Sequence, residues 1–381
     1  MRNFISTLVI LFAAFAVHTM ASEAATPFVN SFTPFSVMSQ GYGHVQGIAV
    51  DKQKGHVYFS FTTSLVKTDL KGHVIGSVTG FQGHLGCVTY NAADGKIYAS
   101  LEFKNDAIGK SINKATGRTA TAYNAWYIAA FNSDSINRPD IDCQTSGVLS
   151  VTYLPTVVGD YGQSINGHNG RYGCSGIDGI TFGPAFGHRS GKMLLTVAYG
   201  ITPDTSRIDN DYQVLLQYDL ASIKRYAKPL VQHALHKSGP AKPKGKFFVY
   251  TGNTSWGVQN LAFDPTYGLW LMMVYRGHKP TFPNHTLYVV DSRTKPRQAS
   301  LKGSPCGEKA MTIALLRDGL YHAPSGVFGF TFKYGPWGFA PIGNGYALVS
   351  QPFTDPDKSN GSELHIYRWT GHTPCPFTLV K

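Results

Sequence analysis

The sequence predicts an all-β protein, a β-propeller built from four-stranded antiparallel blades. Two observations lead to this fold. First, a small residue, a short apolar strand, a turn and a second β-rich strand recur five times along the chain. Second, a third strand that alternates in polarity follows each copy, and a fourth strand follows most copies. Four antiparallel strands per repeat are typical of a propeller blade, in which the apolar first strand lies next to the central axis.

The first two strands locate each copy. The turn between them contains Asp94-Gly95 in one copy and Asn344-Gly345 in another. These dipeptides favour the type I′ turns that close β-hairpins, because both central residues need a positive φ. The first strands are expected at 47–51, 86–90, 179–182, 260–264 and 338–342, and the second strands at 57–61, 97–101, 193–197, 270–275 and 346–350.

The outer strands complete the blades and close the ring. The β-prone run 28–38 should supply the outer strand of the last blade. Five blades are favoured, and the segment 304–333, an insertion or a degenerate blade, leaves six or seven open. Third strands are expected at 64–70, 126–131, 213–219, 286–291 and 363–369, and fourth strands at 74–78 and 246–250.

The first residues have the features of an export signal. Arg2 precedes an apolar run, 5–17, and a small-residue cleavage site ends at Ala21. We expect residues 1–21 to be a signal peptide, cleaved between 21 and 25, and residues 26–381 to form a single propeller domain. No later stretch is apolar and long enough to span a bilayer. The sequence therefore predicts a secreted or periplasmic monomer.

The chain is basic, with a net charge of +12, and Arg2 is the only charged residue of 1–21, so 12 − 1 leaves +11 after cleavage. A basic exported protein favours an anionic partner such as an acidic polysaccharide or oligosaccharide, although the charge could serve solubility alone. Nucleic acid is not expected as a partner, because the chain has no dense Lys/Arg run and is predicted to be exported.

Five cysteines leave at least one thiol unpaired. Cys87 lies in an apolar strand and is expected to be that buried thiol. Cys306 and Cys375 could form one disulfide, and Cys143 and Cys174 another. No C-x-x-C spacing predicts a cysteine metal site.

The blade pattern resembles that of NHL-type and gluconolactonase-type propellers. In these, a Gly-apolar-Asp inner strand, here Gly47–Asp51, precedes a second strand that contains tyrosine, here Tyr58. The resemblance covers most of the chain after residue 25. It implies the fold and no particular activity, because one fold hosts many functions.

The repeat also maps one mouth of the central channel. Residues just before each inner strand, and residues that leave each second strand, should line the same mouth and form a pocket there. The candidates before the inner strands are His44, Gln46, His84, Asp178, Gln259, Asn260 and Trp337, and those after the second strands are Glu102, Lys104, Tyr199, Arg276 and Gln351.

Other polar residues have simpler explanations. His168 lies in a glycine-rich polar loop, 162–173, which could close over the pocket or lie free on the surface. Asp51 and Asp264 end inner strands and are expected to form turns. The cluster 209–211 could hold calcium, but an Asx-turn is favoured because the spacing of a calcium loop is missing. No motif for a serine nucleophile, a nucleotide phosphate or a zincin is present.

The favoured function is an enzyme that acts on acidic carbohydrate, most simply a uronate-directed polysaccharide or oligosaccharide lyase. β-Elimination needs a group that neutralises the carboxylate, a base and an acid. Arg276 suits the first role, and His44, His84 and Tyr199 suit the other two. Some propeller-type polysaccharide lyases are similar in using His, Tyr and Arg.

Three alternatives remain. A glycoside hydrolase would use the carboxylates of Glu102 and Asp178, with Asp106 as a third acid. A lactone or ester hydrolase, as the gluconolactonase-type resemblance implies, would hold calcium with Glu102, Asp178 and Asn260. A non-catalytic propeller would bind carbohydrate or protein, and the aromatic content of 13% fits sugar stacking.

Overall fold

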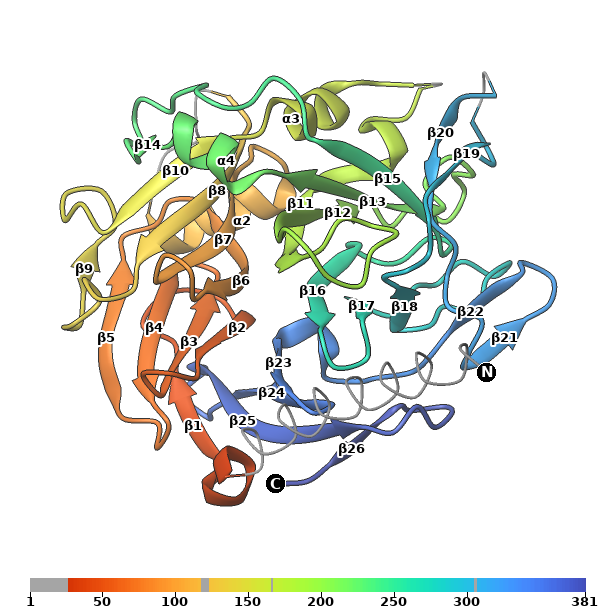
Figure 1. Ribbon diagram of the computed structural model, residues 1–381. Coiled ribbons are helices and arrows are strands. Elements are labelled where there is room, and N and C mark those ends of the chain that lie inside the picture. Colours follow the sequence, from red (N-terminus) through yellow and green to blue (C-terminus); the bar gives the residue numbers. More distant parts are fainter. Residues whose placement is uncertain (1–26, 118–122, 166, 305–306) are drawn as a thin grey trace, which may run out of the picture.

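A computed structural model describes residues 27–117, 123–165, 167–304 and 307–381. Five β-sheets surround a central axis, and each turns one inner strand toward it (Figure 1). The predicted all-β, five-bladed propeller is confirmed. The expected signal peptide, 1–21, lies outside the described residues.

Each of the first two blades has four strands in sequence order and a short added edge strand. Blade 1 contains β2 (Val45–Asp51), β3 (His56–Phe61), β4 (Ser64–Asp69) and β5 (Val74–Thr79), with β9 (Ile141–Asp142) at its edge. Blade 2 contains β6 (His84–Asn91), β7 (Lys96–Phe103), β8 (Ala125–Asn132) and β10 (Leu149–Tyr153), with β14 (Lys228–Pro229) at its edge.

The other three blades follow the same order around the axis. Blade 3 contains β11 (Cys174–Gly183), β12 (Leu194–Ile201), β13 (Tyr212–Tyr218) and β15 (Gly245–Tyr250), extended by β20 (Lys309–Thr312) and β19 (Arg297–Ser300). Blade 4 contains three strands instead of the predicted four, β16 (Val258–Asp264), β17 (Leu269–Val274) and β18 (Leu287–Asp291). Blade 5 contains β23 (Phe339–Gly343), β24 (Tyr346–Thr354), β25 (Asn360–Trp369) and β26 (Phe377–Leu379).

The N-terminal strand closes the ring. β1 (Phe35–Met38) pairs antiparallel with β25 of the last blade, as predicted, whereas residues 27–31 of the same run are helical (Figure 1). The segment 304–333 is an insertion and not a sixth blade. It contributes β20 to blade 3 and the separate hairpin of β21 (Leu320–His322) and β22 (Val327–Gly329). The longer helices, which lie in blade connections, are α2 (Ala107–Thr116), α3 (Pro155–Gly162) and α4 (Leu220–Tyr226).

Small residues let the inner strands approach one another at the axis. A Cβ added to Gly47 would lie 2.8 Å from the Cα of Cys87 on the next blade, so a larger residue does not fit there. Asn260 holds the corresponding position of blade 4 and donates hydrogen bonds to the carbonyls of Gln46 (3.0 Å) and Pro336 (2.8 Å). Gly179 and Gly338 likewise lie against the inner strand of the following blade, as predicted. In blade 2 the prediction of Gly86 was wrong by one residue, because the strand registers place Cys87 at the position of Gly47, Gly179 and Asn260.

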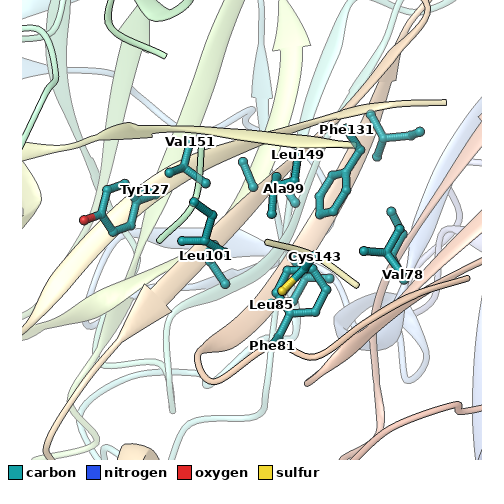
Figure 2. Packing of buried hydrophobic residues seen from close by; sticks show 14 of the residues in the cluster. Val78, Phe81, Leu85, Ala99, Leu101, Tyr127, Phe131, Cys143, Leu149 and Val151 are labelled. Carbon is teal, nitrogen blue, oxygen red and sulfur yellow. The ribbon is translucent and has the colours of Figure 1, made fainter. Parts of the chain in front are cut away.

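Apolar clusters between neighbouring blades form the core. Figure 2 shows Val78 of blade 1 packed in one cluster with Leu101 and Phe131 of blade 2. Burying each side chain of this size contributes about 1.5–3 kcal/mol. Cys143 belongs to this cluster and Cys174 to the next one, so the disulfide between them does not form.

The remaining cysteines and the absence of a membrane span were also predicted. Cys87 is a buried thiol, as predicted, and its Sγ donates to Asn260 Oδ1 at 3.2 Å. The Cys306–Cys375 pairing involves a residue outside the described part of the chain. Among the described residues, no helix has the length and hydropathy of a membrane span.

Candidate functional site

β-Bulges shape the mouth of the channel where the inner strands of blades 1 to 4 begin. The pairing register shifts between Val45 and Gly47, Leu85 and Val88, Ile177 and Ile180, and Val258 and Asn260. A bulge leaves a residue without a cross-strand partner and re-aims its side chain. Three of the predicted channel residues, Gln46, Asp178 and Gln259, lie within these shifts.

The centre of the site joins blades 2 and 3. His84 and Glu102 are direct cross-strand partners at the ends of β6 and β7. His84 Nδ1 lies 3.2 Å from Glu102 Oε1 and 3.8 Å from Asp178 Oδ1. The nitrogen or oxygen atoms of these three residues all lie within 4.8 Å of one another. The predicted convergence is therefore present for this triad.

Glu102 is almost fully buried, with 3% of its side chain exposed. Its Oε1 accepts from Lys104 Nζ at 2.6 Å, and its Oε2 accepts from Trp126 Nε1 at 2.8 Å. Burial alone would raise the pKa of Glu102, but the charge of Lys104 and the contact with His84 outweigh it and lower the pKa to about 2. Gly176 makes room for this arrangement, because a Cβ there would lie 2.2 Å from Glu102 Oε2.

Asp178 is the more accessible carboxylate, with 15% of its side chain exposed. Its Oδ2 accepts from Gln259 Nε2 at 3.2 Å. Burial and then the negative charge of Glu102 raise the pKa of Asp178 to about 6. The two carboxylates thus have pKa values shifted in opposite directions, an arrangement common in sites of acid–base chemistry.

Blade 1 supplies a second imidazole near the triad. His44 Nδ1 lies 2.8 Å from the carbonyl of Val45, and Gln46 Nε2 donates to Thr62 Oγ1 at 3.0 Å. Burial lowers the pKa of His44, and the proximity of His84 adds to this effect. His44 is therefore inclined to stay neutral beside His84.

Two aromatic residues that sequence analysis missed, Tyr275 and Trp256, lie near Asp178 and its partner Gln259, next to the predicted Trp337. The ring of Tyr275 lies 5.7 Å from that of Trp337, and burial together with the Asp178 charge raises the pKa of Tyr275. The carbonyl of Trp256 accepts from Gln259 Nε2 at 2.8 Å, while its side chain is 40% exposed. Tyr42, in the loop before β2, is exposed as well. Exposed aromatic rings beside polar groups are typical of sugar-binding sites, as the planar ring can stack on the pyranose face.

Two of the predicted catalytic residues do not join the triad. Tyr199 is fully buried between blades, and its hydroxyl donates to Asp160 Oδ2 at 2.7 Å. Arg276 is exposed, and among the residues the structure describes it forms no ion pair. Asn260 is also unsuitable as a ligand, since its side-chain atoms are committed to Cys87, Gln46 and Pro336.

The remaining predicted residues lie elsewhere or have structural contacts. His168 Nδ1 lies 3.6 Å from Asp204 Oδ2, in a loop anchored by Arg207. Gln351 Nε2 donates to the hydroxyl of Tyr367 at 2.9 Å. Asp106 caps helix α2 and accepts from the backbone of Ile108 and Gly109. In the cluster 209–211, Asp209 pairs with Arg207 and Asp211 with Lys279, so these carboxylates are neutralised by cations of the chain.

No protein-family model matches this chain, and no curated sequence does. The NHL-type and gluconolactonase-type resemblance therefore has no family match behind it. Among solved structures, the chain is similar to a GH43 β-1,3-galactosidase with galactodeoxynojirimycin, with a TM-score of 0.40 and 10% identity, covering 90% of this chain and 98% of that one.

Two further structures are similar over most of their length. One is a computationally designed protein, with a TM-score of 0.24 and 11% identity, covering 66% of this chain and 94% of that one. The other is a protein of unknown function from Bacteroides caccae, with a TM-score of 0.27 and 12% identity, covering 72% and 87%. Similarity at this level transfers no activity, so the function must follow from the residues of the site.

Proposed function

We propose that this protein is an exported carbohydrate-active enzyme that cleaves uronate-containing glycans by β-elimination at the channel mouth. The contact between His84 Nδ1 and Glu102 Oε1 is the observation that carries the proposal. A buried carboxylate that accepts from Nδ1 places the proton on that nitrogen and leaves Nε2 free to act as a base.

The elimination step divides between His84 and Asp178. His84 Nε2 takes the proton from C5 of the uronate, the electron pair of that C–H bond forms the C4=C5 double bond, and the C4–O bond breaks. Asp178, whose pKa is raised to about 6, donates its proton to the leaving oxygen. The contact of 3.8 Å between these two side chains allows both to reach one sugar ring.

Arg276 is the group best suited to neutralise the substrate carboxylate. It directly follows Tyr275 at the mouth, is exposed and, within the described ranges, forms no ion pair that would have to break. Lys104 is less suitable, because its ammonium is buried against Glu102 at 2.6 Å. Neutralisation by Arg276 lowers the cost of forming the carbanion at C5.

A hydrolase with two carboxylates in direct contact with the sugar fits less well. Such enzymes need both carboxyl groups to face the scissile bond. Glu102 is 3% exposed, and its oxygens already accept from Lys104, Trp126 and His84. Its role is therefore to position His84.

The test is an assay for new ultraviolet absorbance of unsaturated uronate with a panel of acidic polysaccharides. We expect product from the wild type and a loss of about 10²-fold or more in kcat for His84→Ala, Asp178→Asn and Arg276→Ala. His73→Ala is the matched control, because His73 is exposed in the turn after β4, away from this mouth. Wild-type protein that releases no unsaturated product from any of the polymers would refute the proposal.

A second candidate function is metal-assisted hydrolysis of an ester or lactone, favoured by the triad of His84, Glu102 and Asp178. One imidazole and two carboxylates suit zinc or manganese better than calcium, which prefers oxygen ligands alone. Lys104 opposes this candidate, since its charge already neutralises Glu102. Metal analysis of the purified protein, with hydrolysis of lactones before and after chelation, separates the two candidates.

Export is part of the proposal and rests on the N-terminal sequence. The charged start, apolar run and small-residue site predict cleavage between residues 21 and 25. N-terminal sequencing of protein recovered outside the cytoplasm should find one of these cleavage points. Protein that retains Met1 would rule out export by this signal.

A further inference from the structure

A hollow lies on blade 5, at the end of the propeller that carries the triad. Its volume of about 460 Å³ is in the range of small-molecule sites. We call it the blade-5 groove, and its main lining residues are Lys333, Tyr334, Trp337, Gln351, Phe353 and Glu363. These side chains come from the segment before β23 and from the ends of β24 and β25 that lie at the channel mouth.

Trp337 is the lining residue of the groove that lies nearest to the acid–base site. This residue lines the groove, and its ring lies 5.7 Å from that of Tyr275. Tyr275 in turn is close enough to Asp178 for that charge to raise its pKa. A glycan chain that passes from Asp178 over these two rings would reach the groove.

The groove is held in shape by contacts of its own. The ring of Phe353 lies over Gly361 of the neighbouring strand, where an added Cβ would come within 2.3 Å of the ring. Lys333 Nζ lies 4.9 Å from the centre of the Tyr334 ring. Rings that already pack against neighbouring residues lose less conformational entropy on binding than free side chains do.

The charges of the groove do not by themselves indicate its ligand, because they nearly balance. Lys333 provides one positive charge and Glu363 one negative charge, with Glu363 Oε2 only 3.3 Å from His365 Nε2. Three aromatic rings and a few groups that can hydrogen-bond recognise the faces and hydroxyls of sugar rings. A strongly apolar ligand without hydroxyl groups would fit this lining less well.

We propose that the blade-5 groove binds the glycan chain next to the sugar that is cleaved, so that the substrate is an oligosaccharide or polysaccharide and not a monosaccharide derivative. The inference rests on the proposed function for its reaction, but the binding it assigns to the groove can be measured without catalysis. The sugar at Asp178 and the sugars in the groove would then belong to one chain that passes over Trp337.

The experiment measures binding by calorimetry to the Asp178→Asn protein, with tetramers of galacturonate, glucuronate-containing and mannuronate chains and with cellotetraose. We expect at least one tetramer to bind, and Phe353→Ala to weaken it about tenfold. Tyr267→Ala, which changes an exposed aromatic residue in the turn between β16 and β17, should leave that affinity unchanged. Because stacking on the aromatic rings should contribute more to binding than charge does, raising the salt concentration should change the affinity less than Phe353→Ala does.

A kinetic comparison completes the test. In the wild type, kcat/KM should rise from dimer to tetramer of the substrate, and Phe353→Ala should remove most of that rise. No binding of any tetramer, or binding and chain-length dependence unaffected by Phe353→Ala, would overturn the groove proposal. Binding that depends on Phe353 without any unsaturated product would overturn the elimination reaction and leave the groove as a glycan site.

Discussion

Acidic side chains serve different purposes at the two ends of the channel. At the end where β2 and β16 finish, Asp51 Oδ1 accepts from the backbone N–H groups of Gln53 and Lys54 at 3.0 and 3.1 Å, and Asp264 Oδ1 accepts from Thr266 at 2.8 Å. These carboxylates close hairpin turns, as the sequence predicted. At the opposite end, Glu102 and Asp178 are satisfied by side chains.

The residues around the two ends of the channel also differ in polarity. The end with the turns opens into a hollow of about 300 Å³ lined mostly by apolar residues of the inner strands. The other end carries the bulges of four inner strands, which aim polar side chains at the axis. Asp51 and Asp264 accept from backbone N–H groups and are fixed in turns, whereas Glu102 and Asp178 face titratable side chains that shift their two pKa values in opposite directions. The proposed acid–base chemistry therefore belongs to the end that carries Glu102 and Asp178.

The largest expected effect on stability comes from Glu102→Gln. The substitution leaves Lys104, which is 4% exposed, as a buried charge without its close partner. Breaking a buried ion pair in this way costs about 3 kcal/mol or more of the free energy of unfolding. Denaturant titration at neutral pH measures the loss.

The double variant Glu102→Gln with Lys104→Met serves as the control. It removes both charges of the pair, so most of the lost stability should return. Catalysis should stay low in both variants, because His84 has lost the carboxylate that positions it. A single variant as stable as the wild type would contradict the role of Glu102 as the anchor of this end.

The next effect is a gain in stability from Asp178→Asn. The pKa of Asp178 is about 6 in the folded protein against an ordinary value of 3.8, so the folded state binds the proton more tightly. The stability that protonated Asp178 contributes is therefore fully present below about pH 4 and is lost as the pH rises toward 6. The amide that Asp178→Asn introduces cannot ionise, so the variant escapes this loss.

The expected difference between Asp178→Asn and the wild type is on the order of 2 kcal/mol at pH 7 and close to zero at about pH 3.5. Thermal unfolding across this pH range measures it, and the variant should lose activity although it is more stable. A variant that is less stable than the wild type at pH 7 would show that Asp178 is held by stabilising contacts and is not strained by burial.

The smallest effect belongs to the other end of the channel. Asp264→Ala removes the acceptor for Thr266 N–H in the turn between β16 and β17 and should cost about 1 kcal/mol. Catalysis should be unchanged, because this turn lies at the end without the acid–base site. Loss of activity with an intact fold would break the contrast between the two ends.

Much of the propeller could be predicted because strand sequences reflect local rules. Alternation of side chains, Asp-Gly and Asn-Gly turns and small residues at the axis located the strands of all five blades to within a few residues. His84 and Glu102 were found in the same way, since cross-strand partners follow from hairpin pairing. The blade count needed the structure, because an insertion such as 304–333 contains strand-like residues without being a blade.

In blades 3 and 4 the residue named from the sequence differs by one position from the residue that corresponds to Glu102. Leu101, Tyr199 and Val274 pair with Leu85, Ile177 and Val258 and are buried between blades. The residue after each, Glu102, Gly200 or Tyr275, lies toward the channel. Sequence analysis named Glu102 at this position in blade 2, the preceding residue, Tyr199, in blade 3, and the following residue, Arg276, in blade 4. Arg276 keeps its role in the proposed reaction as an exposed cation next to Tyr275.

The sequence by itself thus determined the strands, the order of the blades and the types of polar residue that gather near the axis, since these depend on neighbours along the chain. The tertiary structure alone decided which side chains meet. A bulge shifts the register by one residue, and in a strand with a period of two that shift moves a side chain to the opposite face. The shifted pKa values of Glu102 and Asp178 also needed the fold, because they arise from Lys104, His84 and burial contributed by two blades.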